Sequence, residues 1–189
     1  MSASFGCRTL FGAVTVLALA CDRASAADKA QDEQHILSFD SAAVRLASSR
    51  DTVRIEVELA VSADQRTMGL MERRQLADDH GMLFVYDSTQ PPTAGFWMFR
   101  TKIPLDIAFL DSAGVVRSTR SMVPCETVIA QGCPTYTPDV PYRYALELSS
   151  GFLQRHGIVV DGSKLLLADI PNAMLHGSST RPDTARGIR

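Results

Sequence analysis

The most constraining feature of this sequence is the alternation of apolar and polar residues in TVRIEVELAV, residues 52–61. Val53, Ile55, Val57 and Leu59 occupy every second position, and arginine or glutamate stands between them. Successive side chains of a β-strand point to opposite faces of the sheet, so this pattern is typical of a strand with one buried and one exposed face. The segment therefore predicts a sheet that packs a core on one side.

Other parts of the chain have the length and composition of further short strands. They are residues 81–87, 95–99, 105–111, 114–123, 144–149 and 164–169. The segment DSAG, residues 111–114, predicts a hairpin turn between two of these strands. Pro104 is expected to end the aromatic strand before it, because proline cannot donate a ladder hydrogen bond.

Two short segments change to a helical pattern. Ser62 is a suitable N-cap with Gln65 three residues later, which is a capping-box arrangement. The segment SSGFLQRHG predicts a second helix, capped by Ser149 or Ser150 and ended by Gly157. Many short strands with two short helices predict an α+β fold of mainly antiparallel β structure, for which a partly closed barrel is one solution.

The N-terminal segment resembles an export signal. Arg8 precedes an apolar run at residues 10–20, which is shorter than the roughly 20 residues that span a bilayer. The small residues ASA at 24–26 fit a signal-peptidase site, so residues 1–26 are predicted to be a signal peptide and Ala27 the first mature residue. The protein is then expected to be exported, as a periplasmic or secreted protein.

An alternative processing site is Cys21, which follows LALA as in a lipoprotein signal. Attachment to a membrane is expected only if Cys21 is lipidated. The remaining chain divides into a flexible leader at 27–39, one β-rich domain at 40–170 and a disordered tail at 171–189. The formal net charge is −2 and the longest basic run is Arg73-Arg74, so nucleic acid is not an expected partner.

The cysteines point to a disulfide. Cys7 and Cys21 lie in the predicted leader, which leaves Cys125 and Cys133 in the mature chain. An even number of cysteines in an oxidising compartment predicts a disulfide between these two. A metal or redox pair is the less favoured alternative, because such cysteines usually stand two residues apart.

Four residues are candidates for a ligand site. Arg66 and Arg73 flank Gly69, and an arginine can bind a carboxylate or phosphate with two parallel hydrogen bonds. Trp97, the single tryptophan, offers an aromatic wall, and Asp106 is a carboxylate within an apolar strand. Together they are typical of a cleft for a polar ligand. The alternative is structural, with solvated arginines and a salt bridge between Asp106 and one of them.

Catalytic and metal-binding motifs are sparse. The mature chain contains neither HExxH nor GxSxG nor a phosphate-binding glycine loop. Asp106 or Glu147 could act as a general acid or base if burial raised its pKa. Thioether sulfurs suit Cu(I), but core packing is the favoured role of the four methionines Met68, Met71, Met82 and Met98. No metal or cofactor is predicted.

Several fragments in a fixed order resemble a known family. They are RTMGLMERRQL, GMLFVYD, FWMFRTKIPLDIAFLD, MVPC, CPTY, YALELSSGF and HGI, within residues 40–167. They are similar to a bacterial and archaeal family called domain of unknown function 192. The resemblance implies a compact β-rich fold, often exported, with no established activity. Phe99 and Arg100 stand where that family typically has lysine and asparagine, which weakens any essential role for those residue types.

Three functions remain open at this point. The favoured one is an exported binding or accessory module for a small polar or anionic ligand, or for an envelope component, near Arg66, Arg73, Trp97 and Asp106. The alternative is a hydrolase that uses Asp106 or Glu147 as general acid or base. A purely structural envelope protein would have no concave site.

Overall fold

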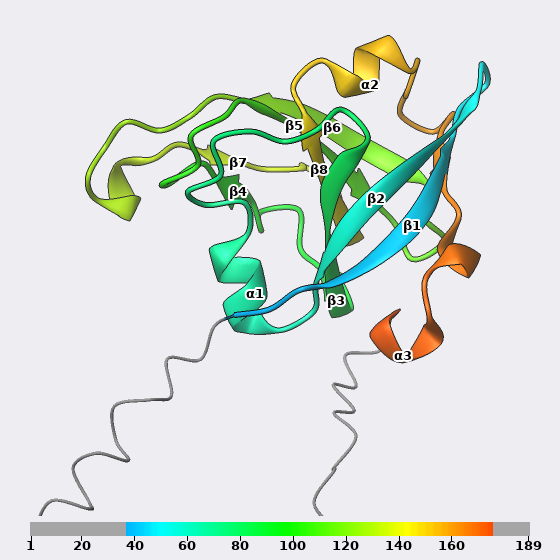
Figure 1. Cartoon of the computed structure of the whole chain (residues 1–189), viewed down its shortest axis with the longest axis horizontal. Helices are drawn as coiled ribbons and strands as arrows, with labels where there is room; N and C mark the ends of the chain where they lie inside the picture. Colours follow the sequence, from blue (N-terminus) through cyan, green and yellow to red (C-terminus); the bar gives the residue numbers. More distant parts are fainter. Residues whose placement is uncertain (1–36, 176–189) are drawn as a thin grey trace, which may run out of the picture. The chain divides into compact units, whose positions relative to one another are not determined.

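The computed structural model describes residues 37–175, drawn in colour in Figure 1. The predicted signal peptide, the alternative site at Cys21 and most of the predicted leader lie outside the described residues. No helix of the described part is long and apolar enough to span a membrane.

The described residues form a seven-stranded sheet and a separate two-stranded sheet. The large sheet has the order β6-β5-β8-β3-β2-β1-β9, and β4 pairs with β7 in the small one. The strands are β1 (Asp40–Ala47), β2 (Thr52–Ala60), β3 (His80–Gln90), β4 (Phe96–Trp97), β5 (Leu105–Leu110), β6 (Val116–Met122), β7 (Thr135–Tyr136), β8 (Tyr142–Ser149) and β9 (Lys164–Leu165). Only the β2–β3 pair is parallel among the strand pairs of the described residues. The predicted α+β class, mainly antiparallel β, is confirmed.

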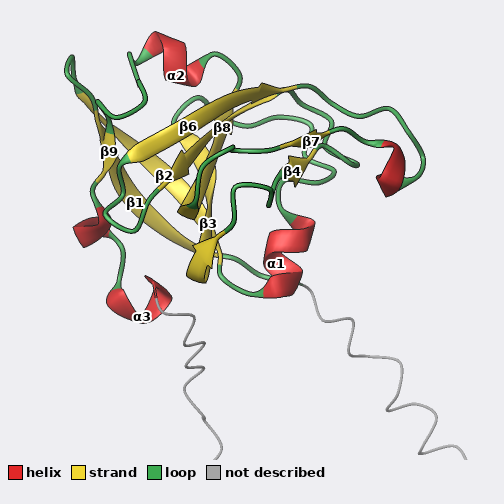
Figure 2. Cartoon of the chain, turned by 180° about the vertical axis from the view of Figure 1, so that it is seen from behind, coloured by secondary structure: helices red, strands yellow, loops and turns green. Residues whose placement is uncertain are grey.

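The large sheet curls until its two ends meet. An isolated antiparallel bridge joins Val115, beside β6, to Lys164 in β9. The Leu165 amide also donates a hydrogen bond of 2.8 Å to the Gly114 carbonyl. Gly114 has φ +82°, and a Cβ there would lie 2.4 Å from the Leu165 carbonyl oxygen, so this turn requires glycine. The sheet is thus a partly closed barrel, as Figure 2 shows from behind.

The predicted strands differ from the structure mainly at their ends. The alternating segment forms β2, as predicted, and DSAG turns the chain between β5 and β6. Sequence reasoning missed β1, whose central Ala42 and Ala43 give only a weak alternation. The segment 164–169 is strand for two residues and then the 3₁₀ turn Leu167–Asp169, because its pairing with β1 ends at Leu165.

The two faces of the sheet pack two different cores. The inner core lies within the curl and takes side chains from all seven strands, such as Leu46, Leu83 and Leu146. The outer core lies on the other face and includes Met82, Phe84, Met98, Ile107 and Phe109. Residues that alternate along one strand therefore enter different cores.

The helix α1 (Ala63–Met68) begins with the predicted capping box. The Ser62 hydroxyl accepts a hydrogen bond of 3.1 Å from the Gln65 amide, and the Gln65 side chain accepts one of 2.9 Å from the Ser62 amide. The helix ends at Gly69, where φ is +49°. This short helix turns the chain from β2 towards β3 beside the outer core.

The predicted cap of the second helix is wrong. The helix α2 (Phe152–Arg155) follows Gly151 in a left-handed conformation, with no side-chain cap of its own. The Ser149 hydroxyl instead donates a hydrogen bond to Asp78. The Leu153 amide, at the start of α2, donates one of 3.2 Å to Asp106 Oδ2 from β5. A residue distant in sequence therefore replaces the local serine as the acceptor.

The third helix, α3 (Asn172–Leu175), falls within the segment 171–189 for which disorder was expected. Leu175 is buried in the inner core, which explains why these first residues are folded. The rest of that segment lies outside the described residues.

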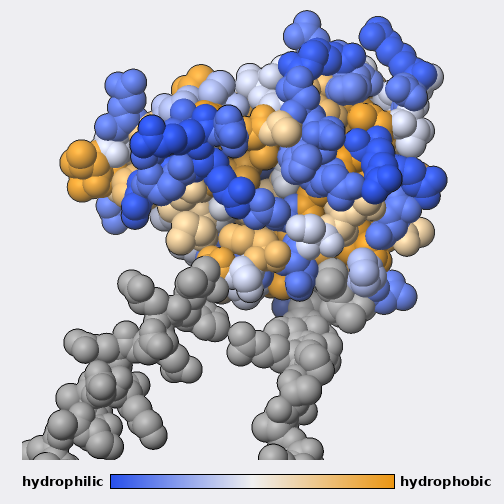
Figure 3. Space-filling view, in the orientation of Figure 1, coloured by the Kyte–Doolittle hydropathy of each residue, from blue (hydrophilic) through white to orange (hydrophobic). Residues whose placement is uncertain are grey.

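The predicted disulfide is present between Cys125 and Cys133, with a Cα–Cα distance of 5.7 Å. It closes a loop that contains the 3₁₀ turn Ala130–Gly132. Val128 is 92% exposed and Ile129 60% exposed in this loop. An apolar tip is visible at the left of Figure 3, where the loop projects. A structural disulfide suggests a location outside the reducing cytoplasm.

Candidate functional site

A cavity of about 420 Å³ lies over the outer core, between α1, the loop that follows it, β3, β4 and β8. Apolar side chains make about half of its wall. They include Met68, Leu70, Met71, Phe84, Phe96 and Trp97. Phe84 and Phe96 meet edge to face at 4.9 Å between ring centroids, which holds both rings in place. Trp97 and Met68 are each 43% exposed, so both stand where the cavity meets solvent.

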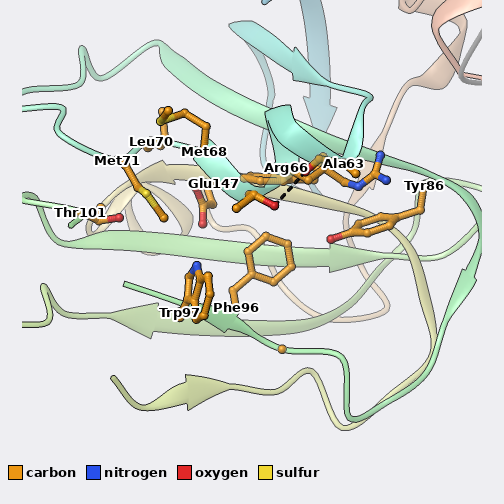
Figure 4. Close-up of a pocket in the computed structure, with 14 residues that line it drawn as sticks. Ala63, Arg66, Met68, Leu70, Met71, Tyr86, Phe96, Trp97, Thr101 and Glu147 are labelled. Atoms are coloured by element: carbon orange, nitrogen blue, oxygen red, sulfur yellow. Dashed lines mark hydrogen bonds between the residues drawn. The ribbon is translucent and has the colours of Figure 1, made fainter. Parts of the chain in front are cut away.

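Glu147 of β8 is the acidic residue of this cavity, and Figure 4 shows it among the aromatic and methionine side chains. In the sheet it lies between Met82 of β3 and Ile107 of β5, both fully buried. Glu147 itself is only 4% exposed. Its carboxyl makes no hydrogen bond and no ion pair with another residue of the described part. Burial raises the pKa of Glu147 to about 8, because the charged form is poorly solvated there.

Thr101 is a second buried polar residue of the cavity wall. It is 7% exposed, and its hydroxyl has no hydrogen-bond partner within residues 37–175. Its amide donates to the Met98 carbonyl at 3.1 Å, which forms a turn directly after β4. Figure 4 shows Thr101, Met71, Glu147 and Trp97 towards one end of the cavity. Two unpaired polar groups therefore face the same space.

Arg66 lies at the other end of the cavity, together with Tyr86. Its Nη1 donates to the carbonyls of Val61 at 2.5 Å and Val85 at 3.0 Å. Its guanidinium carbon lies 4.9 Å from the centroid of the Tyr86 ring, a cation–π contact. Arg66 thus anchors α1 to β3, whereas its Nε and Nη2 make no hydrogen bond within the described residues.

A strained junction joins the loop that carries Met71 to the turn that carries Thr101. Glu72 and Arg100 both have positive φ, at 61° and 57°. The Glu72 amide donates to the Arg100 carbonyl at 2.8 Å, and the Glu72 carboxylate pairs with Arg100 at 2.7 Å and Lys102 at 2.5 Å. Hydrogen bonds from Lys102 and Arg100 lower the pKa of Glu72. Non-glycine residues in this conformation cluster at functional sites, where the surrounding structure holds them.

The structure brings together two of the four predicted site residues, Arg66 and Trp97. Arg73 does not line the cavity. Its Nη2 pairs with the Glu58 carboxylate of β2 at 2.6 Å. Arg73 therefore has the structural role that was the alternative for the arginines.

Asp106 is separated from the cavity by the sheet itself. It pairs in register with Leu148 of β8, whereas Glu147 pairs with Ile107. Because neighbours in register share a face, Asp106 belongs to the face of the inner core and Glu147 to the other. Asp106 is 3% exposed and accepts hydrogen bonds from the Ser121 hydroxyl at 2.9 Å and the Leu153 amide. The expected salt bridge with an arginine is absent among the described residues.

Sequence reasoning considered Glu147 only as a general acid or base. A stronger signal was present in YALELS, where Ala145 on the same side of the strand is also apolar. A strand with apolar residues on both faces is buried on both faces, so a glutamate within it is buried too. Thr101 gave no such signal, because its burial depends on the turn after β4.

The methionines divide between core and cavity. Met82 and Met98 are fully buried in the outer core, whereas Met68 and Met71 line the cavity. Within the described part of the chain, no group of three or more histidine, cysteine, aspartate or glutamate residues could hold a metal ion.

The chain is similar to several solved structures. A protein from Sinorhizobium meliloti 1021, described as a proposed transcription regulator, is 38% identical, with a TM-score of 0.61 over 69% of this chain and 95% of that one. A protein of unknown function from Novosphingobium aromaticivorans DSM 12444 is 27% identical, with a TM-score of 0.61 over 70% of this chain and 89% of that one. No curated protein matches the sequence.

A family model described as an uncharacterized ACR matches residues 44–165. This range includes the strands β2 to β8 and every residue of the cavity wall. More than half of the chain is matched, and so the chain belongs to the domain of unknown function 192 family.

Proposed function

We propose that this protein is an exported small-molecule binding module and that the cavity beside α1 is its ligand site. One observation supports this most directly. The Glu147 carboxyl is 4% exposed, has no partner among the described residues and faces an open cavity. An unpaired polar group that is buried costs free energy unless something satisfies it. A bound ligand would supply the missing partner.

The size and wall of the cavity support the same proposal. Small-molecule sites usually occupy about 300–1,000 Å³ and combine apolar walls with a few polar groups. This cavity has about 420 Å³, an aromatic and methionine wall, and polar groups at Glu147, Thr101 and Arg66. A ligand with an apolar body and one polar group fits this arrangement. An anionic ligand has less support than a polar one, because a carboxyl lies in the wall.

Export remains part of the proposal. It is supported by the predicted signal peptide at residues 1–26 and by the Cys125–Cys133 disulfide. Mass spectrometry of the protein from culture fractions would distinguish a chain that starts at Ala27 from one that is lipidated at Cys21.

Nucleic acid is a poor candidate for the ligand. Most arginines of the described part are paired with carboxylates, so little free positive charge is left to bind phosphates. These pairs are Arg45–Asp169, Arg54–Glu56, Arg73–Glu58, Arg100–Glu72, Arg117–Asp111, Arg117–Asp161, Arg120–Asp139 and Arg155–Asp78. The description of the Sinorhizobium meliloti protein as a regulator is therefore not extended to this chain.

A screen of small polar metabolites and cell-wall fragments would test the proposal. Trp97 is the single tryptophan and stands at the cavity, so its fluorescence should change when a ligand binds. Trp97→Ala should abolish the thermal stabilisation that the ligand gives, whereas Val128→Ala should keep it. Val128 is the matched control, since it is an exposed apolar residue of the disulfide loop and does not line the cavity. Ligands that stabilise both variants equally would show that the cavity is not the site.

A second candidate is an acid–base enzyme, which the raised pKa of Glu147 favours. A carboxyl with a pKa of about 8 is mostly protonated at neutral pH and can donate a proton to a leaving group. Asp106 cannot assist, because it lies on the opposite face of the sheet. Turnover of ester, amide or glycoside substrates that is lost in Glu147→Gln would support this candidate, and equal rates in both proteins would exclude it.

A further inference from the structure

We propose that the ligand of this cavity is an organic ammonium ion, with its cationic group between the Glu147 carboxyl and the Trp97 indole. This inference rests on the proposed function and names the ligand class of the same site. It starts from two side chains, Glu147 and Thr101, that are more than nine-tenths buried, unpartnered within the described residues and turned into one cavity.

The wall of the cavity favours a cation over other ligands. Aromatic faces carry partial negative charge and attract ammonium groups, especially the faces of tryptophan. Phe84, Tyr86, Phe96 and Trp97 all contribute to the wall, and the methionine sulfur atoms of Met68 and Met71 are polarisable. A negatively charged ligand would meet the Glu147 carboxyl and these same faces. An uncharged alcohol would gain only a hydrogen bond.

The position of Glu147 makes its carboxylate a specific partner for such a cation. It lies between Met82 and Ile107 on the sheet, so neither neighbour in the row neutralises it. Arg120 of β6, beyond Ile107 in this row, is paired with Asp139. The nearest carboxylate in that row, Glu58 beyond Met82, is already paired with Arg73 at 2.6 Å. An ammonium group would give Glu147 the counter-ion that Arg73 gives Glu58.

Arg66 does not oppose this arrangement. Figure 4 shows its guanidinium beside Tyr86, towards the other end of the cavity from Thr101. The guanidinium lies over the Tyr86 ring and donates hydrogen bonds to the carbonyls of Val61 and Val85. An acceptor group elsewhere on the ligand can bind the remaining N–H groups of Arg66.

Binding should release a proton. The free Glu147 is mostly protonated at neutral pH because it is buried, and an ammonium ion favours its ionised form. Before binding, the Glu147 carboxyl is protonated and the ammonium ion is free. After binding, the two form an ion pair and the carboxyl proton is in solvent. The other titratable residues of the cavity wall are Arg66 on α1 and Tyr86 on β3. Burial raises the pKa of Tyr86, so it stays neutral.

Calorimetry on the full mature chain tests the inference with four probes that share a four-carbon chain and differ in their polar group. The probes are n-butyltrimethylammonium, n-butylammonium, n-butanol and butyrate. At least one ammonium probe should bind about ten-fold or more tightly than n-butanol, and butyrate should be weakest. Titrations at pH 6.5 in buffers of different ionisation enthalpy should show release of close to one proton for each ligand bound.

Two glutamine variants locate the effect. Glu147→Gln should lose about ten-fold or more in affinity for the ammonium probe and should lose the proton release. Glu58→Gln is the matched control, since it removes a carboxylate from the same face of the sheet but outside the cavity, and its affinity should stay within about two-fold.

The outcomes separate this inference from the proposed function. If n-butanol or butyrate binds as tightly as both ammonium probes, the cavity is a ligand site but its ligand is not a cation. If neither ammonium probe binds below about 10 mM, the inference is wrong, and the broader metabolite screen alone decides the proposed function. Binding that is unchanged in Glu147→Gln would also overturn it.

Discussion

Asp106 and Glu147 lie on neighbouring strands, and both are almost completely buried, yet their surroundings differ completely. Asp106 is 3% exposed and accepts two hydrogen bonds, one from Ser121 and one from the start of α2. Glu147 is 4% exposed, has no partner in the described part of the chain and faces a cavity. The same chemical group is therefore a structural acceptor on one face of the sheet and a candidate ligand group on the other. Partners, rather than burial, distinguish the two roles.

The largest expected effect is a pH dependence of stability that Glu147 contributes. Its pKa in the folded protein, about 8, is above its ordinary value of 4.5. The folded state therefore binds the proton more tightly, so this contribution is fully present below pH 4.5 and is lost as pH rises through 8. The free energy of unfolding should fall by up to about 1.4 kcal/mol per pH unit between pH 5 and 8.

Urea unfolding of wild type and Glu147→Gln across this range measures the effect. The variant should be more stable than wild type at pH 8 and should show a much flatter profile. Glu72 and Asp169, whose pKa values are lowered by ion pairs, affect stability only in more acidic solution. A profile that Glu147→Gln leaves unchanged would mean that Glu147 is not the group that titrates.

The next largest effect is expected for Asp106→Ala. This change leaves the Ser121 hydroxyl and the buried Leu153 amide without their acceptor, and each such loss costs about 1–3 kcal/mol. We expect a loss of roughly 3 kcal/mol in the free energy of unfolding, measured with urea at pH 5, where Glu147→Gln should cost far less. Equal losses in the two variants at pH 5 would remove the distinction between the two carboxyl groups.

Removal of the disulfide should lower stability without affecting Asp106 or Glu147. Replacing Cys125 and Cys133 together with serine should lower the free energy of unfolding by about 2–3 kcal/mol, because a loop of this length is no longer closed in the unfolded chain. Ligand affinity should remain as in wild type, since neither cysteine lines the cavity. Weaker binding in this double variant would mean that loss of stability alone can impair the site.

The smallest effect is expected for Ser121→Ala. It removes one of the two hydrogen bonds to Asp106 and leaves the bond from the Leu153 amide. The expected cost is about 0.5–1.5 kcal/mol. A double-mutant cycle with Asp106→Ala would show whether the two residues are coupled, and additive losses would speak against the hydrogen bond.

The sequence was sufficient for the fold class, the strand β2, the capping box of α1 and the disulfide, since each depends on residues close together in the chain. It was not sufficient for Asp106 and Glu147. Both are acids within apolar strands, and only the register of β5 against β8 shows that they lie on opposite faces. The place of Arg73 outside the cavity could not be predicted either, because its partner Glu58 comes from another strand. Trp97 and Arg66 both line the cavity, because they lie on short elements that flank it.

The bridge between Val115 and Lys164 affects how strand edges of this protein can pair with those of other copies. Exposed strand edges can pair with other chains, and long free edges promote aggregation. Here the start of β6 meets β9 through the Val115–Lys164 bridge. The far end of β6 is flanked by residues 136–139. Arg120 pairs there with Asp139 at 2.6 Å, and the Val123 amide donates a hydrogen bond of 3.2 Å to the Tyr136 hydroxyl. The start of β6 and the end of β1 therefore offer little free backbone to a neighbouring molecule.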